Sequence, residues 1–183
     1  MCQKWSRIID GLRVLNKTTF FECLENGKIY WKSFENKFSP SQRHSHSSCR
    51  INNDLYIFGG LSGTSTSYND LWLFDLSLKT WSRPKCNGSY PSPKAASTLL
   101  PYKKKILLYG GYSHPYSYSY LHQQVSFFDE MHLFCTETSQ WSQVLFSLEA
   151  PKLAGHTASI INQTKMIMFG GCNGSLGKFI IFD

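Results

Sequence analysis

The first indications of function come from what the sequence lacks. Its 183 residues contain no cysteine pair at CxxC spacing, no apolar run long enough to cross a membrane and no secretory signal pattern. They also contain no phosphate-binding or dinucleotide-binding glycine motif, and no GxSxG, HExxH or Cys–His arrangement of a hydrolase. These absences argue against zinc modules, membrane proteins, nucleotide-dependent enzymes and the common hydrolases. We therefore expect a non-catalytic chain without a cofactor.

The cysteines are scattered along the chain rather than grouped. Two of them fall inside predicted strands, where a thiol packs rather than binds a metal. This distribution predicts reduced thiols in an intracellular protein, located in the cytoplasm, the nucleus or both. The six positions are Cys2, Cys23, Cys49, Cys86, Cys135 and Cys172.

Acidic residues are scarce, with 12 Asp and Glu against 19 Lys and Arg, which gives a formal net charge of +7. A nucleic-acid-binding chain would show a basic stripe with interleaved aromatic side chains. Here Lys103, Lys104 and Lys105 occupy one predicted tight turn, and the other basic residues are spread out. We therefore expect no nucleic-acid partner and no membrane partner.

Three apolar runs end in the same Gly-Gly pair. They are LYIFGG at 55–60, ILLYGG at 106–111 and MIMFGG at 166–171, separated by 51 and 60 residues. A period of about 50 residues is typical of Kelch repeats, in which each unit forms one four-stranded blade of a β-propeller. Glycine permits positive φ and close backbone approach, so we expect structural roles for Gly59, Gly60, Gly110, Gly111, Gly170 and Gly171.

Aromatic residues keep a constant register with the glycine pairs. Phe74 precedes Trp81 by seven residues, and Phe134 precedes Trp141 by seven. Each tryptophan also stands fifteen residues before the start of the next repeat, in the pairs Trp31 and His46, Trp81 and Ala96, and Trp141 and His156. Trp31 has no earlier strands of its own blade. Residues 28–34 are therefore predicted to be a closing strand that completes the last blade of the ring.

These repeats predict an all-β fold, a partial Kelch-type β-propeller of about three blades. Within a Kelch region of 35–183, the blades should cover about 44–84, 94–145 and 154–183, and the third is incomplete. The predicted strands are 46–51, 54–59, 70–76 and 80–84 in the first blade, and 95–101, 105–110, 129–136 and 140–145 in the second. His46 begins a predicted strand and is expected to be structural, near the channel, rather than a metal ligand.

The first 27 residues show a helical pattern instead. Trp5, Ile8, Ile9, Leu12 and Leu15 recur at three- and four-residue spacing, which predicts an amphipathic helix. A second short helix is expected from 18 to 25, ended by the Asn-Gly pair at 26–27. Periodicity leaves open that this segment is simply a helix that caps the propeller.

The segment CQKWSRII at 2–9 resembles the last helix of an F-box, and the order of helices, closing strand and blades resembles the F-box/Kelch-repeat protein family. The most specific segments are SYNDLWLFDL at 67–76, NGSYPSPKA at 87–95, LHQ at 121–123, FFDEMH at 127–132 and LAGHTAS at 153–159. The resemblance implies that residues 1–27 are the C-terminal end of an F-box. It also implies a substrate-recognition subunit of a Skp1–cullin–F-box ubiquitin ligase, whose propeller binds the protein to be ubiquitinated.

The sequence departs from this family pattern at both ends. The earlier F-box helices that contact Skp1 have no counterpart here, and neither do the later Kelch blades. We therefore interpret the chain as a fragment. Skp1 and cullin are expected to bind through a full-length F-box and not through residues 1–183 alone.

The long connections between strands are predicted to share one face of the propeller. In a meander, the link from the second to the third strand and the link from the fourth strand to the next blade lie on the same face. In this sequence these links are the long ones, at 61–69, 84–94, 112–128 and 146–152. Long loops on a rigid scaffold usually make the recognition contacts. The target protein is therefore expected to bind Ser62, Thr64, Tyr68, Asn87, Tyr90, His114, Tyr116, Tyr118, Tyr120 and His122. The tyrosines and serines of 112–124 suit such contacts, although their composition is equally that of a disordered insertion.

Two other functions are compatible with a Kelch propeller. One is a protein-interaction scaffold outside a ubiquitin ligase, which would need neither an F-box nor Skp1. The other is a copper oxidase similar to galactose-oxidase-type propellers, with ligands among the tyrosines and His114, His122 and His132. The lack of a recurrent ligand set disfavours the oxidase.

Overall fold

The computed structural model describes residues 21–27, 36–114, 125–173 and 178–182, the last of these as backbone. The chain divides into two compact units, Met1–Glu35 and Asn36–Asp183. Within the described residues, no helix has the length and apolar character needed to cross a membrane.

In the first unit, residues 21–25 are helical and end where the Asn-Gly pair predicts. The backbone N–H of Asn26 donates to the carbonyl of Glu22 at 3.0 Å, and Gly27 has a φ of 63°. Glycine takes this left-handed conformation without strain, which stops the helix. The predicted longer helix, residues 1–20 of the proposed F-box end and the closing strand with Trp31 lie outside the described residues.

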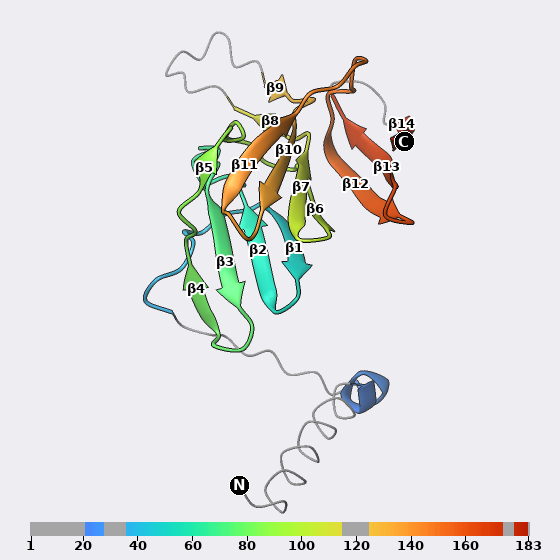
Figure 1. The fold of residues 1–183 in the computed structure, drawn as a ribbon. Coiled ribbons are helices and arrows are strands. Elements are labelled where there is room, and N and C mark those ends of the chain that lie inside the picture. The colour runs from blue at the N-terminus through green and yellow to red at the C-terminus, as the bar shows by residue number, and fades with distance from the viewer. Residues whose placement is uncertain (1–20, 28–35, 115–124, 174–177, 183) are drawn as a thin grey trace, which may run out of the picture. The chain divides into compact units, whose positions relative to one another are not determined.

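The second unit begins with a four-stranded antiparallel meander (Figure 1). The strand order is β1-β2-β3-β4, and each strand pairs with the next along the chain. All four predicted strands of the first blade are confirmed within two residues at each end. The strands are β1 (Ser47–Ile51), β2 (Asp54–Phe58), β3 (Leu71–Asp75) and β4 (Thr80–Ser82).

The second sheet repeats this meander and adds a short fifth strand. The order is β5-β11-β10-β7-β6, with β5 parallel to the outer strand β11. The strand predicted at 95–101 begins three residues later. The strands are β5 (Asn87–Gly88), β6 (Thr98–Tyr102), β7 (Lys105–Tyr109), β10 (Met131–Cys135) and β11 (Gln140–Val144).

Two smaller sheets complete the described structure. β12 (Ala154–Ile161), β13 (Lys165–Cys172) and β14 (Lys178–Phe182) form a third antiparallel meander. β8 (Tyr112–Ser113) and β9 (Ser126–Phe127) form a two-stranded sheet beyond the ends of β7 and β10 (Figure 1).

The first strands of the three meanders lie next to one another, as they do around the axis of a propeller. β6 contacts both β1 and β12. Hydrogen bonds also join the residues before these strands: Ala96 N–H donates to Ser45 at 2.8 Å, and Gly155 N–H donates to Ala96 at 2.8 Å. The all-β propeller architecture predicted from the repeats is therefore confirmed.

Apolar side chains fill the spaces between neighbouring sheets. Between the first and second sheets, the rings of Phe58 and Trp141 lie 5.6 Å apart, and both residues are almost fully buried. The aromatic residues spaced seven apart lie in contact, with ring separations of 4.8 Å for the half-buried pair Phe74 and Trp81 and 5.0 Å for the buried pair Phe134 and Trp141. A second cluster, centred on Tyr109, joins the second sheet to the third.

The glycine pairs form joints between consecutive sheets. Gly60 N–H donates to the carbonyl of Lys94 at 3.0 Å, and Gly111 N–H donates to the carbonyl of Leu153 at 2.7 Å. A Cβ on Gly59 would lie 2.4 Å from the same Lys94 oxygen, and one on Gly110 would lie 2.5 Å from the Leu153 oxygen. The close backbone approach expected at these positions is therefore present.

Candidate protein-interaction surface

The long connections meet on one face of the second unit, as the alternating strand directions of a meander predict. The loop at 61–69 and the β8–β9 hairpin are linked by a hydrogen bond from Ser113 Oγ to Ser67 Oγ at 3.2 Å. The hairpin in turn joins the last connection, because Leu153 N–H donates to the carbonyl of Phe128 at 3.2 Å. We call this surface the loop face.

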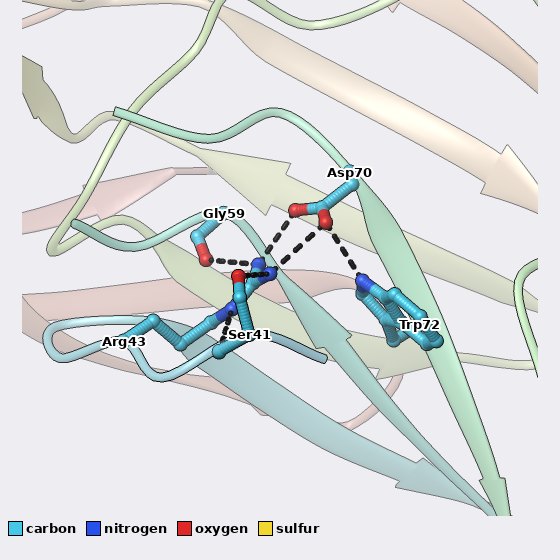
Figure 2. A network of polar contacts seen from close by, with 5 residues as sticks. All are labelled: Ser41, Arg43, Gly59, Asp70 and Trp72. Atoms are coloured by element: carbon cyan, nitrogen blue, oxygen red, sulfur yellow. Dashed lines mark hydrogen bonds and ion pairs between the residues drawn. The ribbon is translucent and has the colours of Figure 1, made fainter. Parts of the chain in front are cut away.

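Arg43 anchors the loop face of the first blade (Figure 2). Its guanidinium binds the carboxylate of Asp70 in a bidentate manner, at 2.6 and 3.0 Å, and donates to the carbonyl of Gly59 at 3.0 Å. The same group lies 4.3 Å from the centre of the Tyr68 ring. Planar arginine suits this combination of fork-like hydrogen bonding and stacking. The entry to β1 is thereby fixed to the loop that leads into β3.

Asp70 is the shared acceptor of this network. Besides Arg43, the indole Nε1–H of Trp72 donates to its Oδ2 at 2.7 Å. Burial opposes ionisation of this carboxyl, but the hydrogen bonds from Arg43 and Trp72 and the charge of Arg43 outweigh burial and hold its pKa below the usual value. The network therefore stays charged at neutral pH.

The second blade has a related network at equivalent positions. Lys94 is fully buried, and its Nζ lies 2.7 Å from Oε2 of Glu130. Ser92 Oγ donates to the other carboxylate oxygen at 2.6 Å, and the Lys94 ammonium lies 4.4 Å from the centre of the Phe128 ring. Burial raises the pKa of Glu130, but bonds from Lys94 and Ser92 outweigh it and hold that pKa below its usual value. In each blade, the ion pair links the segment before the first strand of the meander to the residue just before its third strand.

The predicted binding residues of the first blade lie on the loop face. Ser62 and Thr64 share a hydrogen bond of 2.9 Å between their hydroxyls, and Thr64 is exposed. Tyr68 is half-buried beneath Arg43, so its ring supports the loop as well as facing outward.

The other predicted binding residues are distributed differently. Asn87 lies in β5 at the outer edge of the second sheet, and Tyr90 packs 6.4 Å from the ring of Trp141. His114 is partly buried, with its ring 5.5 Å from that of Tyr112. Tyr116, Tyr118, Tyr120 and His122 lie outside the described residues. The structure therefore brings Ser62, Thr64 and Tyr68 together, whereas Asn87 and Tyr90 follow the outer edge.

Two adjoining hollows lie where the loop face passes from the second sheet to the third. The first has a volume of about 520 Å³ and the second about 490 Å³. They meet at Lys152 and Asn173, which line both. Other lining residues are Val125, Ser126, Phe127, Phe128 and Asp129 in the first hollow, and Glu149, Ala150 and Pro151 in the second.

Sequence reasoning identified the loops but missed the charged residues that organise them. Arg43, Asp70, Lys94 and Glu130 stand at equivalent places in two repeats, so recurrence of opposite charges was the available signal. Asp129 and Lys152 had no such signal, because a hollow depends on how two separate connections fold against each other.

Histidines of the described chain do not gather into a metal site. No group of three or more His, Cys, Asp or Glu side chains that could hold a metal ion occurs within the described residues. His132, one of the candidate copper ligands, is instead buried in β10 with its ring 6.3 Å from Trp141.

Comparison with known proteins gives a consistent family relationship. Residues 43–183 match the family described as the FBX42 β-propeller domain. Acyl-CoA-binding domain-containing protein 5 of Arabidopsis thaliana is 30% identical over 138 residues, which cover 74% of this chain and 20% of that protein. Kelch domain-containing protein 3 of Bos taurus is 23% identical over 142 residues, covering 76% and 35% respectively.

A solved structure shows the same fold. The structure of YjhT is similar with a TM-score of 0.54 and 21% sequence identity, over 73% of this chain and 35% of that one. The chain thus spans about a third or less of these relatives' length. Kelch-type propellers commonly serve in protein interaction, and the continuous match over residues 43–183 places the chain in the FBX42 β-propeller domain family.

Proposed function

We propose that this chain is the substrate-recognition part of a Skp1–cullin–F-box ubiquitin ligase, closest to F-box only protein 42, and that it binds a target protein through its loop face. The observation that carries the proposal is the match of residues 43–183 to the FBX42 β-propeller domain. The resemblance of CQKWSRII at 2–9 to the end of an F-box supports the same assignment.

The arrangement of the loop face suits recognition. Where the structure describes them, its loops are held by ion pairs and glycine joints, so a partner would meet a preorganised surface at these residues. Preorganised surfaces lose less conformational entropy on binding. In this role the chain is non-catalytic: it raises the effective concentration of the target near the conjugating enzyme, and other subunits transfer ubiquitin.

Skp1 binding tests the ligase assignment. Residues 1–183 are compared with the same chain extended at its N-terminus by the missing F-box helices, each mixed with purified Skp1 and analysed by size-exclusion chromatography. We expect a complex with the extended chain and none with residues 1–183. If the extended chain also fails to bind Skp1, the ligase assignment is wrong and a Kelch scaffold outside a ligase takes its place.

A further inference from the structure

β9 lines the first hollow with Ser126 and Phe127, and no described strand pairs with its outer edge. Phe127 stands opposite Tyr112, while Phe128 N–H donates to the carbonyl of Gly111 at 3.0 Å. In an antiparallel ladder this pattern makes the Tyr112–Phe127 pair the non-hydrogen-bonded one, so the N–H and C=O of Phe127 point away from β8. In the part of the chain that the structure describes, the sheet ends at β9. Its free edge is therefore available to another strand.

Charged side chains flank this edge. Asp129 and Lys152 line the first hollow, and Glu149 lines the second. The neighbouring Glu130 is already paired with Lys94, whereas the three flanking residues make no ion pair within the described chain. Two carboxylates and one ammonium thus line the path formed by the two adjoining hollows. The path is net negative on a chain whose formal charge is +7.

We infer that this path binds an extended segment of a partner protein, which adds as a third strand to the edge of β9 and places a basic side chain beside Asp129. Strand addition satisfies the free N–H and C=O of Phe127, and the side chains of an added strand alternate between the hollow and the solvent. Charge complementarity favours lysine or arginine at the position facing Asp129.

This inference rests on the proposed function only in that the partner segment would belong to the ligase target. Strand addition depends on main-chain hydrogen bonds for affinity and on alternate side chains for specificity. The partner is therefore defined by two properties: an extended backbone free of proline at the pairing positions, and a basic residue at one fixed position.

A positional-scanning library of short peptides tests the inference directly. The chain, fused to a solubility tag, is probed with pools that each fix one residue type at one position, and binding is measured by fluorescence polarisation. We expect a pool with fixed lysine or arginine to bind best, and Asp129→Asn to weaken it by about five-fold, as for a rim charge pair. Asp129→Lys should shift the preference at that position to aspartate or glutamate.

Backbone methylation separates strand addition from a simple charge contact. In the best peptide, N-methylation should abolish binding at alternate positions and leave the others nearly unchanged, because only every second N–H faces β9. Glu137→Gln, an exposed acid at the β10–β11 turn on the opposite face, is the matched control and should bind the peptide normally. Thermal melts of each variant check folding.

Several outcomes would overturn the inference. These are binding of no pool, a preference unchanged by both Asp129 variants, or uniform tolerance of N-methylation. Self-association of the chain that Asp129→Lys abolishes, without peptide binding, would instead assign the edge to a second copy. None of these results bears on Skp1 binding, so the proposed function stands or falls separately.

Discussion

The carbonyl oxygen of Lys94 explains why the first residue of the first glycine pair is glycine. Gly60 donates a hydrogen bond to it, and a Cβ on Gly59 would lie 2.4 Å away from it. Gly59 and Gly60 also have φ values of 64° and 96°, which side chains disfavour. A Cβ on Gly60 would lie 2.8 Å from a different oxygen, the carbonyl of His44, so neither position tolerates a side chain.

Substitution of Gly59 by alanine should therefore destabilise the second unit strongly. We expect Gly59→Ala to lower the free energy of unfolding by about 2–4 kcal/mol, from backbone strain and displacement of the Lys94 carbonyl. Urea denaturation followed by tryptophan fluorescence measures it. Gly63→Ala is the matched control, because a Cβ there has no atom within 4 Å. Equal stability of the two variants would contradict the argument.

For these backbone contacts, the sequence predicts the glycine but not the carbonyl group that the glycine approaches. The repeat of Gly-Gly at the ends of apolar runs predicted positions of positive φ and close approach. All six glycines have positive φ, and all but Gly170 have a close neighbour. The acceptor could not be predicted, since Lys94 lies 34 residues after Gly60 in a connection with no regular pattern. Its buried position also contradicts the usual expectation that lysine is exposed.

The two complete meanders differ most in the group that stands two residues after the paired acid. In the first, Trp72 donates a hydrogen bond to Asp70. In the second, His132 occupies that place beside Lys94 and Glu130, is 3% exposed and has no partner for its Nδ1. The same element therefore carries a neutral indole in one blade and a titratable imidazole in the next.

His132 should make stability depend on pH. Burial, and secondarily the charge of Lys94, lower the pKa of His132, while Glu130 opposes them. Because the folded pKa lies below that of the unfolded chain, the unfolded state binds the proton more readily. Stability should be complete above the usual histidine pKa of about 6.5 and fall as the pH decreases toward the folded value. Urea titrations across this range measure the slope.

His132→Phe tests the source of that slope. The variant removes the titrating group while filling the same space, so we expect a flatter pH dependence below neutrality. His156, whose pKa is lowered by burial, and His46, whose pKa is lowered by burial and by Arg43, add changes of the same sign. His156→Phe should therefore flatten a further part of the slope. Identical slopes for wild type and His132→Phe would show that the imidazole is not protonated on unfolding.

At the scale of elements, regular strands follow from the sequence and short ones do not. The alternation and apolar runs predicted eight strands of the first two blades nearly at their observed bounds. The strands β5, β8 and β9 have only two residues each, and they exist because connections fold against β11 and against each other. Pairing of that kind depends on tertiary contacts that no local pattern encodes.

Across the second unit, the two faces differ in the length of their connections. The turns at Asn52-Asn53 and Lys103-Lys104 are as tight as predicted, and each contains a residue of positive φ. The opposite loop face has the ion pairs, the hollows and the free edge of β9. This asymmetry is the main argument for placing recognition on one face.

Alanine at Tyr116, Tyr118 and Tyr120 should therefore weaken capture of the target without unfolding the propeller. These tyrosines belong to the longest connection of the loop face, and tyrosine supplies contact area at small entropic cost. Loss of such contacts typically costs more than about 1 kcal/mol for a few residues of an interface, or at least about five-fold in affinity.

Quantitative cross-linking of the tagged chain in cells, with wild type as reference, measures capture. Leu78→Ala, an exposed apolar side chain at the β3–β4 turn on the opposite face, is the control and should retain every partner. Equal loss of partners with Leu78→Ala, or full retention with the tyrosine variant, would move recognition away from this loop.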